Sequence, residues 1–429
     1  MNSYIPEILG LTGLGLVAVF TIFCACRWPF LSRILFVAFT FRMFAAVVNA
    51  YVVPLPDSTA DARTFEIVAW EWAQGGVAEA IQQFTGPDSY FISWVLSVLY
   101  AATDRSLLMA QSVSLLFGLG TVVLGTLLTR EIWGTRAAIK AGWLLALFPT
   151  LILYSALVMR EAYIWFFVLV ALYGVALWAR YGDFRYLMLA LAGFLGAAFF
   201  HGAMFVGALF FLLYVAFWAL TRLLKGLSQC RLHLFACVLI LSTLVVILGY
   251  TSSGVSLPKL GTFQQAINSE RILVLVDSRT RGSDDKVGAS FPEWTQPASV
   301  SEIPFKSPAR MAYFTFSPFP WDVRTPAHLI GLVDGLLYML LVFLIWRNKR
   351  AIWANPAARA ILFIILGYIL VFSFGIGNFG TGIRHRAKFV AGLIILAAPL
   401  LPMLRFLPKQ IVQCCTAPAC TKKAAHNNI

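Results

Sequence analysis

Two aspartates, Asp57 and Asp61, stand directly after a hydrophobic segment that is long enough to cross a bilayer. They lie in the run Pro54-Leu-Pro-Asp-Ser-Thr-Ala-Asp-Ala-Arg63, among prolines and small residues. Carboxylates at the mouth of a membrane span are costly to place there without a function. A carboxylate can accept a proton from a substrate hydroxyl, so both are candidate catalytic bases. The alternative is that they only solvate an outer loop.

Cations gather in a second short segment, Gly377-Asn-Phe-Gly-Thr-Gly-Ile-Arg-His-Arg-Ala-Lys388. Arg384 and Lys388 are spaced i, i+4 and would share one face of a helix. With His385 and Arg386 they form a candidate site for a lipid phosphate. The alternatives are contacts with lipid headgroups, or a topology in which this loop lies on the other side of the membrane.

Three more candidates lie at predicted ends of spans. Arg160 and Glu161 open one span, where they are either a pair that binds phosphate and substrate or an interface anchor. His201 occupies a tight turn between two spans. It either contacts substrate or is only a turn histidine.

Arg42 lies near the middle of a predicted span, 33–53. A cation at that depth costs roughly 2.5–3.5 kcal/mol on insertion scales, so it should face the interior and have a partner. That partner is either Asp334, in a structural ion pair, or a buried phosphate.

The long segment 251–326 ends in a surface rich in proline and aromatic residues. Arg310, Trp321 and Arg324 are candidate substrate-binding residues there. Aromatic faces suit sugar rings and equally suit the membrane interface, so both interpretations stay open.

These residues need a membrane framework, and the composition supplies one. The 429 residues are 60% hydrophobic and 12% charged, with a mean hydropathy of +0.81, which excludes a soluble protein. A span needs about 20 apolar residues, and long unbroken apolar runs favour helices over barrel strands. We therefore predict an all-α polytopic membrane protein with about eleven spans. They lie near 6–25, 33–53, 106–129, 138–158, 161–179, 184–200, 203–221, 232–250, 327–346, 358–376 and 387–404.

The net charge of +14 follows the positive-inside pattern, because basic residues recur in alternate short loops. This predicts a bacterial inner-membrane protein with a periplasmic N-terminus, a cytoplasmic C-terminus and no nucleic-acid partner. Segment 88–103 is interpreted as an interfacial helix that does not cross. The predicted parts are two N-terminal spans (1–53), an outer acidic loop with interfacial helices (54–105), a six-span bundle (106–250), a long outer loop (251–326), three C-terminal spans (327–404) and a basic cytoplasmic tail (405–429).

Acids on one outer loop and cations on others, above a lipid-facing bundle, suit a reaction between a sugar hydroxyl and a lipid-phosphate sugar. A carboxylate would accept the proton of the acceptor hydroxyl. Arginine and lysine would stabilise the departing phosphate or diphosphate. No glycine pattern for nucleotide binding is present, and this reaction needs none.

The run Asp57-x3-Asp61-Ala, followed by Gly75-Gly76, resembles the first outer loop of GT-C-type membrane glycosyltransferases. The similarity covers roughly residues 50–180 and continues through Leu116-Phe-Gly-Leu-Gly120, Leu127-Leu-Thr-Arg-Glu-Ile-Trp-Gly134, Leu147-Phe-Pro149 and Arg160-Glu161. It implies a polyprenyl-phosphate or polyprenyl-diphosphate sugar as the donor substrate. It also implies an acidic residue in the first outer loop, which maps to Asp57 or Asp61, and in some members a divalent cation, Mg or Mn, held by such acids.

The chain departs from that family in having two predicted spans before the acidic loop instead of one. Its second half is similar in style to bacterial oligosaccharide repeat-unit polymerases, which join lipid-diphosphate-linked glycans on the same face and rely on outer-loop arginines. A lipid-linked sugar flippase or transporter is a third interpretation, although the inverted repeats typical of transporters are not evident. The expected partners are a polyprenyl-linked sugar donor, a glycan or lipid-linked acceptor, membrane lipids and other polysaccharide-assembly proteins.

Overall fold

A computed structural model describes residues 4–227, 290–324 and 326–403, together with a few isolated positions between 237 and 252. The described part is helical, and its one β-type pairing is an isolated bridge between Ser290 and Asn378. The α-helices are α1 (Ile5–Arg27), α2 (Ser32–Tyr51), α3 (Asp61–Ala73), α4 (Val77–Gln82), α5 (Phe91–Ala102), α6 (Leu107–Trp133), α7 (Thr135–Leu147), α8 (Pro149–Ser155), α9 (Arg160–Tyr181), α10 (Phe184–Phe200), α11 (Val206–Leu227), α15 (Ile303–Phe316), α16 (Pro326–Arg347), α17 (Lys349–Ala354), α18 (Pro356–Gly375) and α19 (Phe379–Ala397).

The prediction of an all-α fold with several apolar spans is confirmed for the described residues, but the predicted number of spans is wrong. Six helices there are long and apolar enough to cross a membrane, or seven if the bent pair α7–α8 counts as one span. Of the other four predicted spans, 232–250 lies outside the described residues. The rest correspond to α10, which has only 17 residues, to α16, some of whose side chains lie outside the described residues, and to α19, whose first half carries the basic cluster.

The break between α7 and α8 has a cause in the sequence. Pro149 has no backbone N–H, and it forces the preceding residue, Phe148, into an extended conformation with ψ 122°. The two helices therefore meet at 56°. The carbonyl of Leu145 loses the partner that residue 149 would supply in a continuous helix. In a membrane such a freed carbonyl needs another donor.

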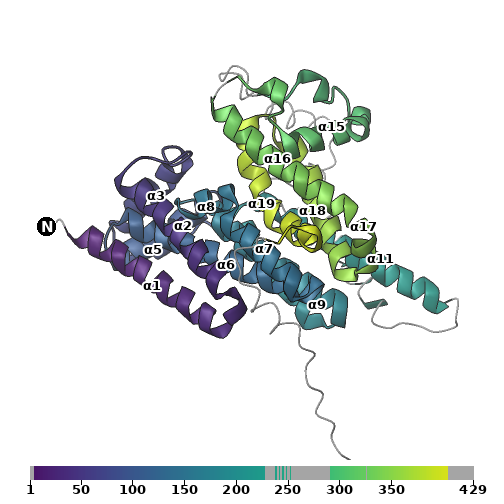
Figure 1. Ribbon diagram of the computed structural model, residues 1–429, viewed down its shortest axis with the longest axis horizontal. Helices are drawn as coiled ribbons and strands as arrows, with labels where there is room; N and C mark the ends of the chain where they lie inside the picture. Colours follow the sequence, from purple (N-terminus) through teal and green to yellow (C-terminus); the bar gives the residue numbers. More distant parts are fainter. Residues whose placement is uncertain are drawn as a thin grey trace, which may run out of the picture.

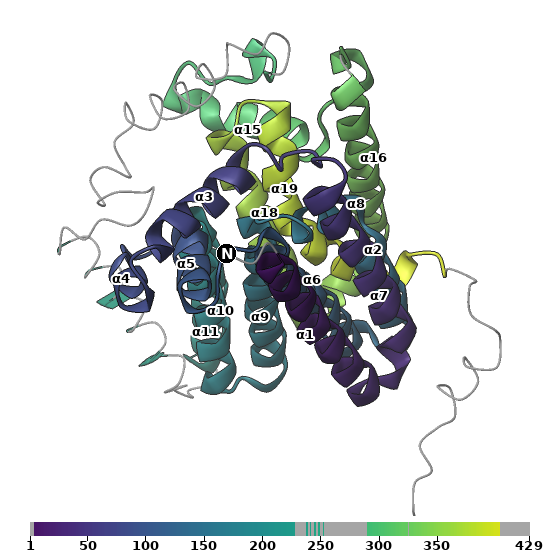
Figure 2. The ribbon, with the colours of Figure 1, turned by 90° about the vertical axis from the view of Figure 1, so that its left-hand side faces the viewer.

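Successive long helices run in opposite directions, so every second connection lies at the same end of the bundle. One end holds α3 to α5 and the first residues of α6, α9 and α19, and we name it the α3 end. Figures 1 and 2 both place α3 and α15 at this end. At the opposite end, Trp133 Nε1 donates to the Ile395 carbonyl at 3.0 Å, which ties α6 to α19.

The loop between α2 and α6 forms a helical layer instead of a further span. Its α5 has 12 residues, a length of about 18 Å at 1.5 Å per residue, against a hydrocarbon core of about 30 Å. The Ser93 hydroxyl donates to the Phe65 carbonyl at 2.8 Å and joins α5 to α3. Arg105 donates to both carboxylate oxygens of Glu66, at 2.9 and 2.7 Å. These hydrogen bonds raise the pKa of Arg105.

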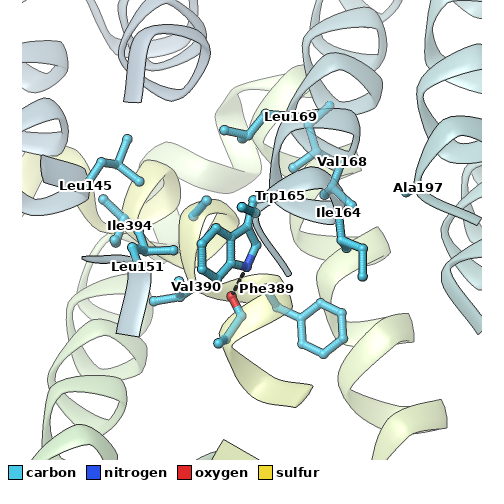
Figure 3. Packing of buried hydrophobic residues seen from close by; sticks show 14 of the residues in the cluster. Leu145, Leu151, Ile164, Trp165, Val168, Leu169, Ala197, Phe389, Val390 and Ile394 are labelled. Atoms are coloured by element: carbon cyan, nitrogen blue, oxygen red, sulfur yellow. Dashed lines mark hydrogen bonds between the residues drawn. The ribbon is translucent and has the colours of Figure 1, made fainter. Parts of the chain in front are cut away.

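The core beneath the α3 end is centred on Trp165 of α9. Its indole is 1% exposed and packs among aliphatic side chains from α7, α9 and α19 (Figure 3). Its Nε1 donates to the Ala387 carbonyl of α19 at 2.8 Å. This contact fixes α9 against α19 one turn below Glu161 and directly beside Lys388, so the core sets the register of the candidate site.

Candidate functional site

Arg384, in the first turns of α19, bridges carboxylates from two other helices. Its Nε donates to Glu161 Oε1 at 2.8 Å, and its Nη1 donates to Asp61 Oδ2. Asp61 is the first residue of α3 and Glu161 is the second residue of α9. Helix N-termini favour negative charge, so both acids are stabilised where they stand. Three helix starts thus converge on one guanidinium.

Lys388 lies behind this bridge. Its Nζ is 3.8 Å from Glu161 Oε1, and both side chains are 1% exposed. The same Nζ is 2.9 Å from His385 Nδ1, and the His385 ring lies 5.2 Å from the ring of His201. Of the predicted set Arg384, His385, Arg386 and Lys388, the structure places Arg384 and Lys388 beside Glu161 and His385 beside Lys388. His201 lies next to His385, at the α10–α11 turn.

Arg160 completes the cluster from the start of α9. Its Nη1 donates to the Ser89 carbonyl at 3.4 Å, and its guanidinium stacks 4.9 Å above the Phe65 ring. The charges of Glu161, Arg384 and Asp61 all act on it. We use the name Arg384 cluster for Arg160, Glu161, Asp61, Arg384 and Lys388.

Two donors of the Arg384 cluster have no acceptor within the described residues: Arg384 Nη2 and Arg160 Nε are buried without a hydrogen-bond partner. A buried donor without an acceptor costs about 1–3 kcal/mol, and more when it is charged. The carboxylates of Glu161, Asp61 and Asp88 all act on Arg160, and the buried Glu161 Oε2 also has no hydrogen-bond partner in the described part of the chain. The two buried donors without acceptors are the feature that suits a bound anion.

Asp57 is arranged differently from Asp61. Its φ is +65°, a left-handed conformation that aspartate tolerates better than most side chains. Its Oδ2 accepts a hydrogen bond from the Tyr154 hydroxyl at 2.9 Å. Tyr154 lies on α8, just after the break at Pro149, so the bent span reaches up to the acidic loop. Tyr154 was not among the residues predicted from the sequence, although Pro149 within a predicted span indicated irregular structure there.

Arg42 does not pair with Asp334, and that predicted alternative is wrong. Its Nη2 donates to the Leu145 carbonyl at 3.0 Å, and its Nη1 to the Ala146 carbonyl at 2.8 Å. These are the carbonyls at the end of α7, including the one that Pro149 leaves without a donor. Arg42 thus stabilises the broken span.

Asp334 pairs instead with Arg386. Its Oδ2 accepts from Arg386 Nη2 at 2.7 Å and from Nε at 3.0 Å. Arg386 also donates to the carbonyls of Thr315, Ser317 and Gly331. Arg386 therefore points away from Arg384 and joins α19 to α16 and α15.

The candidates from the long outer loop lie apart from the Arg384 cluster. Arg310 is fully buried and donates to the carbonyls of Ser373 and Ile376 at 3.0 and 2.9 Å. Burial lowers the pKa of Arg310 to about 10. Trp321 is 70% exposed and stacks on Phe319 at 4.9 Å. The backbone N–H of Arg324 donates to His328 Nδ1 at 3.2 Å.

The aspartates do not form a divalent-cation site with the residues described. Among these residues, no group of three or more His, Cys, Asp or Glu side chains could hold a metal ion. Asp57 binds Tyr154 and Asp61 binds Arg384. The side chains present thus do not fit the Mg or Mn site that the resemblance implies for some family members, and we propose no step through one.

The fold and its apolar helices define an all-helical polytopic membrane protein with an acid–base cluster at one end of the bundle. No protein-family model, curated protein or solved structure matches the chain. Its function is therefore argued from the site alone.

Proposed function

We propose that the chain is an integral membrane glycosyltransferase of bacterial surface-polysaccharide or glycan assembly. It would act at the periplasmic face of the inner membrane, with a GT-C-like arrangement, and transfer a sugar from a polyprenyl-phosphate or polyprenyl-diphosphate donor to an acceptor hydroxyl. The observation that carries this proposal is the bridge from Arg384 to Asp61 and Glu161. It joins Asp61 of the first outer loop and Glu161 at the start of α9 to Arg384 in the basic segment.

The proposed phosphate site consists of Arg384, Lys388 and Arg160. The buried donors Arg384 Nη2 and Arg160 Nε would be satisfied by phosphate oxygens. The apolar helices beneath would hold the polyprenyl chain, which keeps the phosphate at the level of the helix ends. In a dry site these cations stabilise developing negative charge more strongly than they would in water.

The proposed reaction is a single displacement at the anomeric carbon of the donor sugar. The oxygen of the acceptor hydroxyl forms a bond to this carbon, and the bond from the carbon to the phosphate oxygen breaks. The hydroxyl proton moves to the carboxylate of Asp57 or Asp61. The bonding electron pair leaves with the phosphate, which Arg384 and Lys388 stabilise.

A repeat-unit polymerase is the second candidate, and the burial of Arg384 and Lys388 beside Glu161 favours it equally. Its chemistry differs in using a lipid-diphosphate-linked glycan as both donor and acceptor. The substrates used therefore distinguish the two candidate functions, whereas the residues of the Arg384 cluster do not.

The test uses purified full-length protein in lipid nanodiscs. A polyprenyl-diphosphate-linked repeat unit is supplied alone, and in a parallel reaction a polyprenyl-phosphate monosaccharide is added. Product that requires the monosaccharide lipid supports the glycosyltransferase. A ladder of products from the repeat unit alone identifies a polymerase.

Arg384→Gln is the variant for this assay, and Arg185→Gln is its control, because Arg185 is 88% exposed at the opposite end of the bundle. Loss of product in the first and normal product in the second supports the site. Movement of the lipid-linked sugar across a vesicle membrane, without any new glycosidic bond, would overturn the proposal in favour of a transporter.

A further inference from the structure

A pocket of about 250 Å³ lies at the α3 end, beside the first two turns of α3. Asn49 near the end of α2, Leu107 at the start of α6 and the segment before α9 line its other sides. Its lining residues are Asn49, Pro54, Ser58, Thr59, Ala62, Arg63, Glu66, Leu107, Leu157 and Val158. None of the proposed roles above uses this pocket.

The walls of the pocket are held by the protein itself. Asn49 Oδ1 accepts a hydrogen bond from the Leu55 N–H at 3.0 Å, and the Ser58 N–H donates to the Leu55 carbonyl at 3.1 Å. Glu66 is fixed by its two hydrogen bonds from Arg105. A pocket preformed in this way loses little conformational entropy when a ligand binds.

The lining is mainly apolar and carries a few polar groups. It offers the hydroxyls of Ser58 and Thr59, while its one anion, Glu66, is paired with Arg105 and its one cation, Arg63, is exposed to solvent. The Ser58 hydroxyl oxygen is buried and has no hydrogen-bond partner within the described residues. Apolar side chains such as Leu107 and Val158 complete the wall. Convergent polar groups in an apolar frame are typical of sites for small neutral ligands.

The pocket adjoins the Arg384 cluster through two chain segments. On α3, Asp61 contacts Arg384 while the next residue, Ala62, lines the pocket. Before α9, Val158 lines the pocket two residues ahead of Arg160. Ser58 directly follows Asp57 in sequence. Both candidate bases are therefore sequence neighbours of residues that line the pocket.

We propose that this pocket is the acceptor subsite and binds a neutral, hydroxyl-rich sugar ring, an assignment that rests on the proposed function. The hydroxyls of Ser58 and Thr59 pair with hydroxyls of the sugar, and the apolar wall meets its C–H face. The volume falls just below the roughly 300–1,000 Å³ of pockets that take drug-sized ligands, so it suits one or two sugar rings. The hydroxyls and the mainly apolar wall, with the charges of the lining paired or exposed to solvent, favour a sugar over the phosphate, which the Arg384 cluster takes.

The experiment measures sugar binding without turnover. Saturation-transfer NMR is recorded on the full-length protein in nanodiscs with a panel of methyl glycosides: glucoside, galactoside, mannoside, rhamnoside and N-acetylglucosaminide. At least one glycoside should receive saturation from the wild-type protein. Ala62→Leu fills the pocket and should reduce that signal at least ten-fold. Ala78→Leu, on the exposed face of α4, should leave it unchanged.

A second matched pair of variants, each a threonine replaced by valine, separates loss of sugar binding from a general loss of folding. Thr59→Val removes a lining hydroxyl at nearly constant volume and should weaken glycoside binding several-fold. Thr64→Val makes the same change on an exposed residue of α3 outside the pocket and should not. Equal signals from the wild type, Ala62→Leu and Thr59→Val, or no signal from any glycoside, would overturn the assignment.

Arg384→Gln separates this inference from the proposed function. It should keep glycoside binding while losing transfer, because the acceptor and the phosphate occupy different sites. The wild-type protein could bind a glycoside, and lose that binding in Ala62→Leu, yet transfer no sugar from any lipid donor. This outcome would support the pocket as a sugar site and would reject the proposed transferase function. Loss of glycoside binding in Arg384→Gln would contradict a separate acceptor subsite.

Discussion

Glu161 Oε1 accepts a hydrogen bond from Arg384 Nε at 2.8 Å, in a position where the glutamate side chain is 1% exposed. This contact links two helices whose sequence positions differ by 223 residues. It places a buried negative charge between two cations at one end of the bundle. The stability and the proposed chemistry of the α3 end both depend on it.

Glu161→Gln should strongly destabilise the protein, because it removes the buried charge that balances Arg384 and Lys388. Breaking a buried pair by removing one partner costs about 3–5 kcal/mol. The measurement is the free energy of unfolding in mixed micelles of mild detergent and SDS. Glu131→Gln, which breaks the ion pair with the half-exposed Arg180, is the control and should cost at most about 1 kcal/mol. A similar small loss in both variants would contradict the buried pair.

Arg384 and Arg386 should respond differently to the same substitution, although they are two residues apart. Arg384→Gln should lower transfer at least 100-fold while the protein stays folded, because Lys388 still balances the buried Glu161 and the half-exposed Asp61 can be solvated. Arg386→Gln should lower the thermal unfolding temperature, because Asp334 would be left buried without its partner. Thermal unfolding and transfer, recorded on the same preparations, check this. Equal effects on stability would contradict the division.

Asp61→Asn should abolish transfer in a protein that is still inserted and folded, if Asp61 is the base. The amide keeps the shape of the side chain but cannot accept the proton. Asp57→Asn tests whether Asp57 is the base instead. Tyr154→Phe is measured beside it, because this substitution removes only the hydrogen bond to Asp57. Comparing single-turnover rates of the three variants assigns the base. Normal turnover by Asp61→Asn would exclude Asp61 from the mechanism.

Arg42→Met should destabilise the protein through the broken span and not through a substrate. Hydrogen bonds to charged groups contribute about 1.5–3 kcal/mol each, and Arg42 supplies two to the end of α7. Pro149→Ala restores a backbone N–H that can bond to the Leu145 carbonyl. The cost of Arg42→Met should therefore be smaller in the Pro149→Ala background, as measured by a double-mutant cycle of unfolding free energies. An equal cost in both backgrounds would show that Arg42 does not act on this carbonyl.

Part of this protein was predictable from the sequence because hydropathy and charge are properties of local segments. Continuous apolar runs predicted the helical membrane framework. The alternation of basic loops placed Asp57, Asp61, Arg160 and the segment around Arg384 at one end of the bundle, and the structure brings Asp61, Arg160 and Arg384 together. Counting apolar runs alone overestimated the number of membrane-length helices among the described residues. The count took no account of the break at Pro149 or of the charges in the first half of α19.

Only the tertiary structure decided which charged groups are partners. The sequence contains Arg42, Arg384 and Arg386 as cations and Asp61, Glu161 and Asp334 as acids, but it does not indicate which cation pairs with which acid. A pairing depends on distance and burial across helices that are hundreds of residues apart, and these are set by the packing of side chains such as Trp165 against α19. In a low-dielectric interior each cation must find a partner. Packing therefore gave Arg386 the acid of α16, gave Arg42 the carbonyls of a broken helix, and left Arg384 facing the acidic loop.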